Sequence, residues 1–201
     1  MSIIDDAKEK WSGAINTIVI GASAKDGGTR TSVATVGGAK GIPFVNFDGP
    51  TPYKPVVAME IWDRAPDDWP AVLMKDFGDV VNSPADWAKK CVEKFGAEMI
   101  CLKLAGTHPD FGNASPAQSA AVVKAVLKAV GVPLIVWGCD NDETDIKVLP
   151  ECCEAAKGER VMFGSAKQDN YKTLTAACLA AGHLIIGESP IDINIAKQVN
   201  I

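Results

Sequence analysis

The sequence lacks the features that mark several large protein classes. It has no C-x-x-C pair, no GxxxxGK(S/T) phosphate loop and no apolar run close to the roughly 20 residues of a transmembrane helix. Its first residues show no basic start followed by an apolar core, so we expect no secretory signal and a cytoplasmic location. Acidic residues outnumber basic ones, because the sequence has 25 Asp and Glu but only 20 Lys and Arg. We therefore expect no binding to nucleic acid or to an acidic membrane surface.

The cysteines do not suggest a metal site. Cys152 and Cys153 are adjacent, so on a helix their side chains point about 100° apart and do not easily share one metal ion. Most of the others fall within apolar patterns, which is typical of free, buried thiols in a reducing compartment. Cys139 is the exception, because it follows a predicted strand. Its role stays open, as does that of His108, which lies in a loop after another predicted strand.

What the chain does contain is a repeat of apolar runs and helical patterns. Four glycines follow helical patterns and indicate helix ends: Gly96, Gly131, Gly158 and Gly182. Three segments share a serine cap followed by proline and so predict helix starts: Ser83–Asp86, Ser115–Gln118 and Ser189–Asp192. The predicted strands are Val56–Ile61, Glu98–Leu104, Val132–Trp137, Arg160–Phe163 and His183–Ile186. Because helical patterns alternate with these strands, the strands should be parallel.

Residues 1–50 precede this repeat. Residues 1–14 suggest a short amphipathic helix. Two β-rich runs, Ile15–Ala22 and Thr31–Val36, flank a turn signal and predict a β-hairpin, while residues 41–55 contain four prolines and suggest an irregular connector. The chain is therefore divided into an N-terminal helix and hairpin extension, 1–50, and a (β/α) domain, 51–201.

The regular alternation favours a barrel over a nucleotide-binding sheet. A doubly wound sheet usually begins with a glycine-rich turn, but the first predicted strand-to-helix turn, Asp63–Asp67, contains no glycine. A closed barrel needs eight units, and this chain provides about five. We predict an α/β fold of the TIM (β/α)8 barrel family, incomplete at its C-terminus, with an N-terminal β-hairpin extension.

Polar residues gather where the predicted strands end, which is where parallel folds carry their chemistry. We expect the cofactor-binding residues to be Gly138, Asp140, Ser165, Lys167, Gln168, Asn170, Glu188, Ser189 and Asn194. No nucleophile–base pair and no metal-ligand spacing stands out, so no catalytic or metal-binding residue is assigned. Glu60 and Lys103 lie inside their strands, where they should pair with each other or meet a ligand.

Several segments also resemble a known family. They are GGTR at Gly27–Arg30, PVVAME at Pro55–Glu60, WAKKC at Trp87–Cys91, LKL at Leu102–Leu104, VGVPLIV at Val130–Val136, NYKTLTAAC at Asn170–Cys178 and SPIDINIAKQ at Ser189–Gln198. Together they resemble the small subunit of the corrinoid iron–sulfur protein, which is the delta subunit of the acetyl-CoA decarbonylase/synthase system. Members of that family are longer and complete their barrel.

The resemblance implies a TIM barrel that forms a heterodimer with a large subunit. The large subunit would carry the [4Fe–4S] cluster, and a corrinoid (cobalamin) would lie at the interface, against the mouth of the barrel. The complex would take a methyl group from methyltetrahydrofolate through a separate methyltransferase. It would deliver that group to acetyl-CoA synthase/CO dehydrogenase in the reductive acetyl-CoA (Wood–Ljungdahl) pathway. On this interpretation the chain alone is not catalytic.

Two other functions stay open. The chain could be an autonomous barrel methyltransferase that binds a pterin through Asp140, Asp142, Asn170 and Asn194. It could also be an unrelated barrel enzyme, such as an aldolase with Lys103 as the Schiff-base amine.

Overall fold

A computed structural model describes residues 13–40 and 51–200, so most of the predicted N-terminal helix and part of the connector lie outside the described residues. Five parallel strands form one sheet in the order β3-β4-β5-β6-β7. The strands are β3 Ala58–Trp62, β4 Met99–Lys103, β5 Leu134–Trp137, β6 Met162–Ala166 and β7 Leu184–Gly187. The helices are α2 Ala71–Phe77, α3 Pro84–Phe95, α4 Pro116–Ala129, α5 Asp142–Ala155, α6 Tyr171–Ala181 and α7 Ile193–Val199, with 3-10 turns η1 Ala24–Asp26 and η2 Ala105–Thr107.

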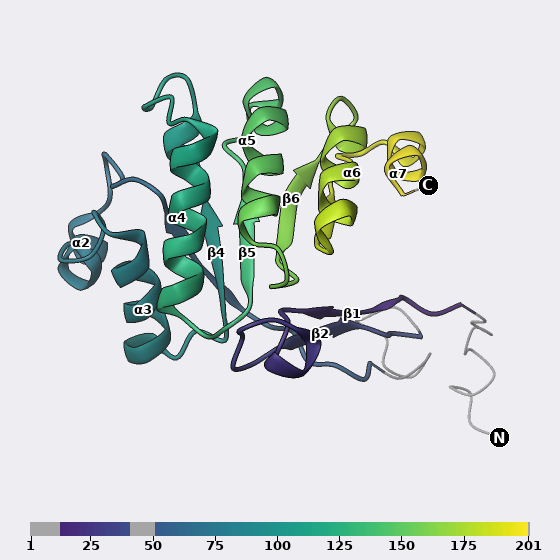
Figure 1. Cartoon of the computed structure of the whole chain (residues 1–201), viewed down its shortest axis with the longest axis horizontal. Coiled ribbons are helices and arrows are strands. Elements are labelled where there is room, and N and C mark those ends of the chain that lie inside the picture. Colours follow the sequence, from purple (N-terminus) through teal and green to yellow (C-terminus); the bar gives the residue numbers. More distant parts are fainter. Residues whose placement is uncertain (1–12, 41–50, 201) are drawn as a thin grey trace, which may run out of the picture.

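The strand order follows the chain without a reversal, which distinguishes this sheet from a doubly wound one. Right-handed crossovers between neighbouring parallel strands place the connecting helices on one face. Figure 1 shows α3 to α6 side by side along that face. The predicted parallel βα units are therefore confirmed. Within the described residues the sheet is open, so the structure shows an α/β fold and does not show a closed barrel.

Alternation along the strands gives the sheet two different faces. In β4, Ile100 and Leu102 are fully buried in the core that the helices cover, together with Trp87 of α3. The intervening residues, Met99 and Lys103 among them, lie on the opposite face because side chains of a strand point alternately up and down. This second face is called the open face below, since no helix of the described residues packs on it.

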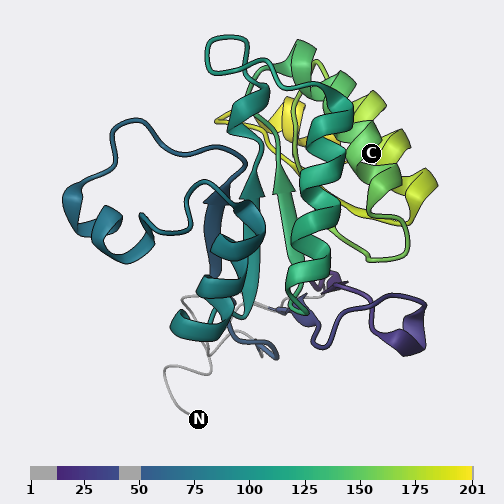
Figure 2. The same cartoon turned by 60° about the vertical axis from the view of Figure 1, so that its left-hand side comes forward.

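The predicted N-terminal hairpin is confirmed. It covers the part of the open face at the amino ends of the parallel strands. Strands β1 Thr17–Ile20 and β2 Ala34–Gly37 pair antiparallel. Ile20 and Ala34 are buried against Met99, and Ile135 and Met162 pack around them. In Figures 1 and 2 the hairpin lies below the amino ends of the parallel strands. Its apolar side is thus covered by the chain's own sheet.

Arg30 fixes the hairpin to the helical layer. Its side chain is 2% exposed and forms an ion pair of 2.8 Å with Glu159. The guanidinium also donates to the carbonyl oxygens of Leu127, Val130 and Val132, at and beyond the end of α4. The last carbonyls of a helix lack partners within the helix, so Arg30 satisfies groups that would otherwise be buried without one.

Gly131 has a different role from the predicted helix cap. Gly96 and Gly182 are left-handed caps, with φ of 69° and 75°, as expected. Helix α4 instead ends at an extended Val130. The Gly131 carbonyl accepts a hydrogen bond of 2.8 Å from the Thr31 amide, and a β-carbon on Gly131 would collide with the Thr31 side chain. Glycine is needed here because the hairpin backbone passes so close.

The predicted helix starts are only partly right. Ser83 and Ser115 accept hydrogen bonds from the amides three residues later, and Ser115 forms a full capping box with Gln118. The third start is wrong. Helix α7 begins at Ile193 and is capped by Asp192, whose carboxylate accepts the Asn194 amide at 2.7 Å. The Ser189 hydroxyl donates to the Asp192 carbonyl and belongs to the preceding turn.

Replacing Arg30 by methionine should destabilise the protein by about 3–5 kcal/mol, because it leaves several carbonyl oxygens without their donor and removes the charge that pairs with Glu159, which keeps only its hydrogen bonds from Thr29. Urea unfolding curves of the two proteins would measure the difference. Lys54→Met is the matched control, since its ion pair with Glu98 is 77% and 58% exposed and should contribute less than about 1 kcal/mol. Equal effects of the two substitutions would contradict the role assigned to Arg30.

Candidate functional site

The carboxyl ends of β3, β4 and β5 enclose a cavity of about 500 Å³. Its lining includes Trp62, Arg64, Lys103, His108, Cys139 and Asp140. We call this cavity and the neighbouring loop after β6 the mouth. Strand ends converge here, so side chains from separate parts of the sequence meet at one edge of the sheet.

Lys103 and Asp140 form the central ion pair of the mouth. The Lys103 ammonium lies 2.9 Å from one Asp140 oxygen, and the Trp137 indole nitrogen donates to the other oxygen at 3.1 Å. Burial raises the pKa of Asp140, but these two hydrogen bonds outweigh it and bring the pKa below its usual value. Burial lowers the pKa of Lys103, and the bond to Asp140 reverses this and raises it. Both groups are therefore charged at neutral pH.

A second polar cluster extends the mouth toward β6. The Lys167 ammonium lies 3.9 Å from carboxylate oxygens of both Asp140 and Asp142. Asn170, which is 1% exposed, donates to Asp142 at 3.2 Å and accepts the Lys167 amide at 2.6 Å. The structure thus brings together three of the predicted binding residues, Asp140, Lys167 and Asn170. Asn170 holds the loop in place and leaves the lysine head group at the surface of the mouth.

The half-buried carboxyl group of Asp63 and the buried one of Asp145 hold the backbone around this cluster. Asp63 accepts the Gly106 amide at 2.7 Å, and Asp145 accepts the Cys139 amide at 2.9 Å. Burial raises the pKa of both aspartates. The predicted residue Gly138 belongs to this arrangement, because a β-carbon there would collide with the Asp145 carboxyl group.

The remaining predicted binding residues are dispersed. Ser165 is buried in β6 and contributes its carbonyl oxygen to Asn170, whereas Gln168 is exposed beside the mouth. The Glu188 amide donates to the Ala166 carbonyl. Ser189 and Asn194 form their hydrogen bonds with Asp192. These last two residues serve the turn and the first residues of α7, and in the described residues no hydrogen bond or ion pair joins them to the Lys103–Asp140 pair.

Of the two alternatives for Glu60 and Lys103, the pairing with each other does not occur. Lys103 turns to Asp140 at the upper rim, and Glu60 accepts the Trp62 indole N–H at 2.7 Å. Trp62 and Trp137 were not among the predicted residues, although Trp137 ends one predicted strand and Trp62 directly follows another. Their indole N–H groups, each held by a carboxylate, could have been anticipated from the Glu60-x-Trp62 and Trp137-x-x-Asp140 spacings, since a partly buried indole needs an acceptor.

The open roles of His108 and Cys139 become clearer. The His108 ring accepts the Asp110 amide through Nδ1 at 3.2 Å and lies 5.2 Å from the Phe111 ring, so it shapes its own loop. Burial raises the pKa of the Cys139 thiol. A thiol of raised pKa is a poor nucleophile, so Cys139 lines the mouth without being activated.

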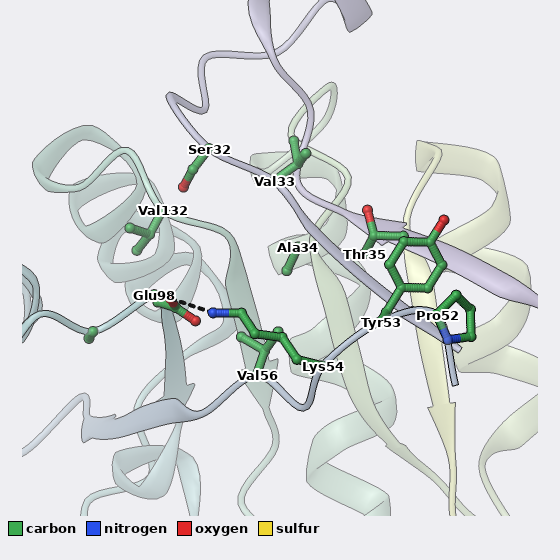
Figure 3. Close-up of a pocket in the computed structure, with 11 residues that line it drawn as sticks. Ser32, Val33, Ala34, Thr35, Pro52, Tyr53, Lys54, Val56, Glu98 and Val132 are labelled. Atoms are coloured by element: carbon green, nitrogen blue, oxygen red, sulfur yellow. Dashed lines mark hydrogen bonds and ion pairs between the residues drawn. The ribbon is translucent and has the colours of Figure 1, made fainter. Parts of the chain in front are cut away.

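Another hollow, of about 600 Å³, lies at the opposite end of the sheet (Figure 3). It is bounded by β2, by residues 52–56 and by Glu98. Lys54 reaches across it to Glu98 at 3.3 Å, and this pair is well exposed. The amino ends of parallel strands rarely carry function, and this hollow offers few convergent polar groups. We therefore place the functional site at the mouth.

In residues 13–40 and 51–200, no three His, Cys, Asp or Glu side chains come together as a metal site. None of the helices in the described part of the chain is long and apolar enough to cross a membrane.

The two kinds of carboxyl group predict opposite pH effects on stability. The pKa of folded Asp145 is raised above 3.8, so the wild type should lose stability relative to Asp145→Asn as pH rises from 3.8 through that raised value. The pKa of folded Asp140 lies below 3.8, so the wild type should lose stability relative to Asp140→Asn as pH falls from 3.8 through that lowered value. Denaturation series across the acid range would measure both differences. Two parallel, flat profiles would contradict the assignments.

Comparison with known proteins gives a consistent family. A family model described as CO dehydrogenase/acetyl-CoA synthase delta subunit matches residues 17–201. The acetyl-CoA decarbonylase/synthase complex subunit delta of Archaeoglobus fulgidus is 39% identical over 194 residues, which are 96% of this chain and 43% of the relative. The subunit delta of Methanocaldococcus jannaschii is 34% identical over 193 residues, 96% of this chain and 47% of the relative. The chain spans less than half the length of these relatives.

Proposed function

The chain belongs to the CO dehydrogenase/acetyl-CoA synthase delta subunit family, and from this premise we propose that it is the corrinoid-shielding small subunit of a corrinoid iron–sulfur protein. The family resemblance in the sequence segments is thereby confirmed. The proposed role is to support methyl transfer from methyltetrahydrofolate, through a methyltransferase, to acetyl-CoA synthase in the reductive acetyl-CoA pathway of the cytoplasm. The proposed partner is a large subunit that holds the [4Fe–4S] cluster and the corrinoid domain.

The observation that supports this proposal is the chemistry of the mouth. A corrinoid is a broad, flat macrocycle whose rim carries neutral amide side chains. The mouth offers aromatic surface from Trp62, and both donors and acceptors from Lys103, Lys167 and Asp140. Trp137 lies beside it, with its indole N–H bonded to Asp140. These groups fit such a rim. When bound, the corrinoid would supply the methyl-carrying cobalt, while this chain would bind, orient and exclude water.

We also propose that the open sheet is part of a (β/α)8 barrel. The strands are parallel and lie in chain order, the helices cover one face, and the hairpin covers the amino end of the other. Both edge strands, β3 and β7, lack a second neighbour among the described residues. Free edges of this kind favour further strand pairing, and the relatives are more than twice as long as the matched region.

Mixing the purified chain with a corrinoid-loaded large subunit should give a stable heterodimer that absorbs visible light. Size-exclusion chromatography with detection in the protein and corrinoid bands would show whether the two coelute. The chain alone should not transfer a methyl group from methyltetrahydrofolate to free cobalamin. Failure of the wild-type chain to bind the loaded large subunit would refute the proposed function, and turnover by the isolated chain would favour the methyltransferase alternative.

The geometry favours the shielding role over the two other functions. Of the four side chains considered for pterin binding, Asn170 is 1% exposed and already bonded to Asp142 and to the Lys167 amide, and Asn194 lies on α7. A Schiff-base lysine needs a lowered pKa to be nucleophilic. The pKa of Lys103 is raised, so we expect no borohydride-trapped adduct at Lys103 with carbonyl compounds, as peptide mass analysis would show.

A further inference from the structure

A groove of about 410 Å³ runs between α4 and α5, two helices that lie side by side in the helical layer (Figure 1). The side chains that line it are exposed or partly exposed, so it lies on the side of the helices that faces away from the sheet. Most of its lining residues are alanines. Its charged residues are Lys124 on the α4 side and Glu151 and Glu154 on the α5 side.

The outer side of α4 carries alanines where a solvent-facing helix usually carries charged side chains. Ala117, Ala121 and Ala125 are all exposed and recur every four residues, so they lie along one side of the helix. The exposed side of α3, by contrast, carries the Lys89–Glu93 ion pair. An alanine side chain loses no rotamer entropy on burial and lets another helix approach closely. The outer side of α4 is therefore suited to contact with protein.

Helices α4 and α5 have opposite charges that are not paired with each other. Helix α4 contains Lys124 and Lys128 and no acidic residue, whereas α5 has acidic residues in its first turn and again at Glu151 and Glu154. Glu154 pairs with Lys157, three residues further along the chain. Lys124 and Glu151 line the same groove, yet among the described residues neither takes part in an ion pair. A basic and an acidic edge thus flank the groove, and each is free to meet a charge of opposite sign.

We propose that this groove is a contact surface between two copies of the chain, related by a two-fold axis that runs along the groove. That symmetry places α4 of one copy over α5 of the other. Lys124 of each copy then lies over Glu151 and Glu154 of the second copy, because these residues line the same part of the groove. Every ion pair occurs twice, as an interface between identical surfaces requires. The groove and the mouth share no lining residue, so this inference does not depend on the proposed function.

Sedimentation velocity of the purified chain at about 1–100 µM tests the proposal, since this range covers the dissociation constants of weak specific dimers. The wild type should pass from a monomer of 21.2 kDa to a dimer of twice that mass as the concentration rises. Lys124→Glu and Glu151→Lys should each weaken dimerisation about tenfold, because each places like charges across the interface. The double variant exchanges the two charges and should dimerise within about threefold of the wild type.

Two further variants control the experiment. Lys172→Glu reverses an exposed lysine on α6, outside the groove, and should leave dimerisation unchanged. Ala121→Arg should keep the fold, as circular dichroism would show, because arginine is a good helix former. Its long side chain fills the groove, so this variant should stay monomeric. A wild type that remains monomeric throughout would overturn the proposal. So would a dimer that the single reversals do not weaken, or one that the double variant does not restore.

Discussion

The packing of the β1–β2 hairpin against the amino end of the sheet is the constraint on which the rest of the structure depends. Met99, Ile135 and Met162 belong to the face that no described helix covers, and the hairpin supplies Ile20 and Ala34 to bury them. Arg30 holds the hairpin in place through a nearly inaccessible network of bonds to Glu159 and to carbonyl oxygens near the end of α4. The hairpin therefore covers the part of the open face at the amino ends of the parallel strands.

At the carboxyl ends of the strands, the same face carries charged and aromatic side chains. There, Trp62, Lys103 and Trp137 are each held by a hydrogen bond to a carboxylate. Asp63, Asp145 and Asn170 each accept a backbone amide of a mouth loop, so half-buried or buried side chains hold these loops in place. A site built in this way is ordered before a ligand arrives, which lowers the entropy that binding must offset.

Much of this fold follows from local patterns in the sequence. Apolar and β-rich runs located the strands of both sheets, and serine-proline pairs located two helix starts, because these signals depend on residues close in the chain. The errors have non-local causes. Gly131 is a glycine because a hairpin a hundred residues away passes over it, and Lys103 pairs with Asp140 of the next strand end instead of Glu60. Trp62, Lys103 and Trp137 lie side by side across the sheet, but this is visible only once strand register is known, since they belong to three separate strands.

We propose that a corrinoid-bearing subunit contacts this chain at the carboxyl ends of the strands and not at the hairpin. Hydrogen–deuterium exchange of the free chain and of the heterodimer tests it most directly. We predict that amides of the mouth loops at residues 104–112, 138–142 and 165–170 exchange more slowly in the complex. The exchange rates of the hairpin amides at residues 17–37 should be unchanged. Protection confined to the hairpin and residues 52–56, with the mouth loops unaffected, would contradict it.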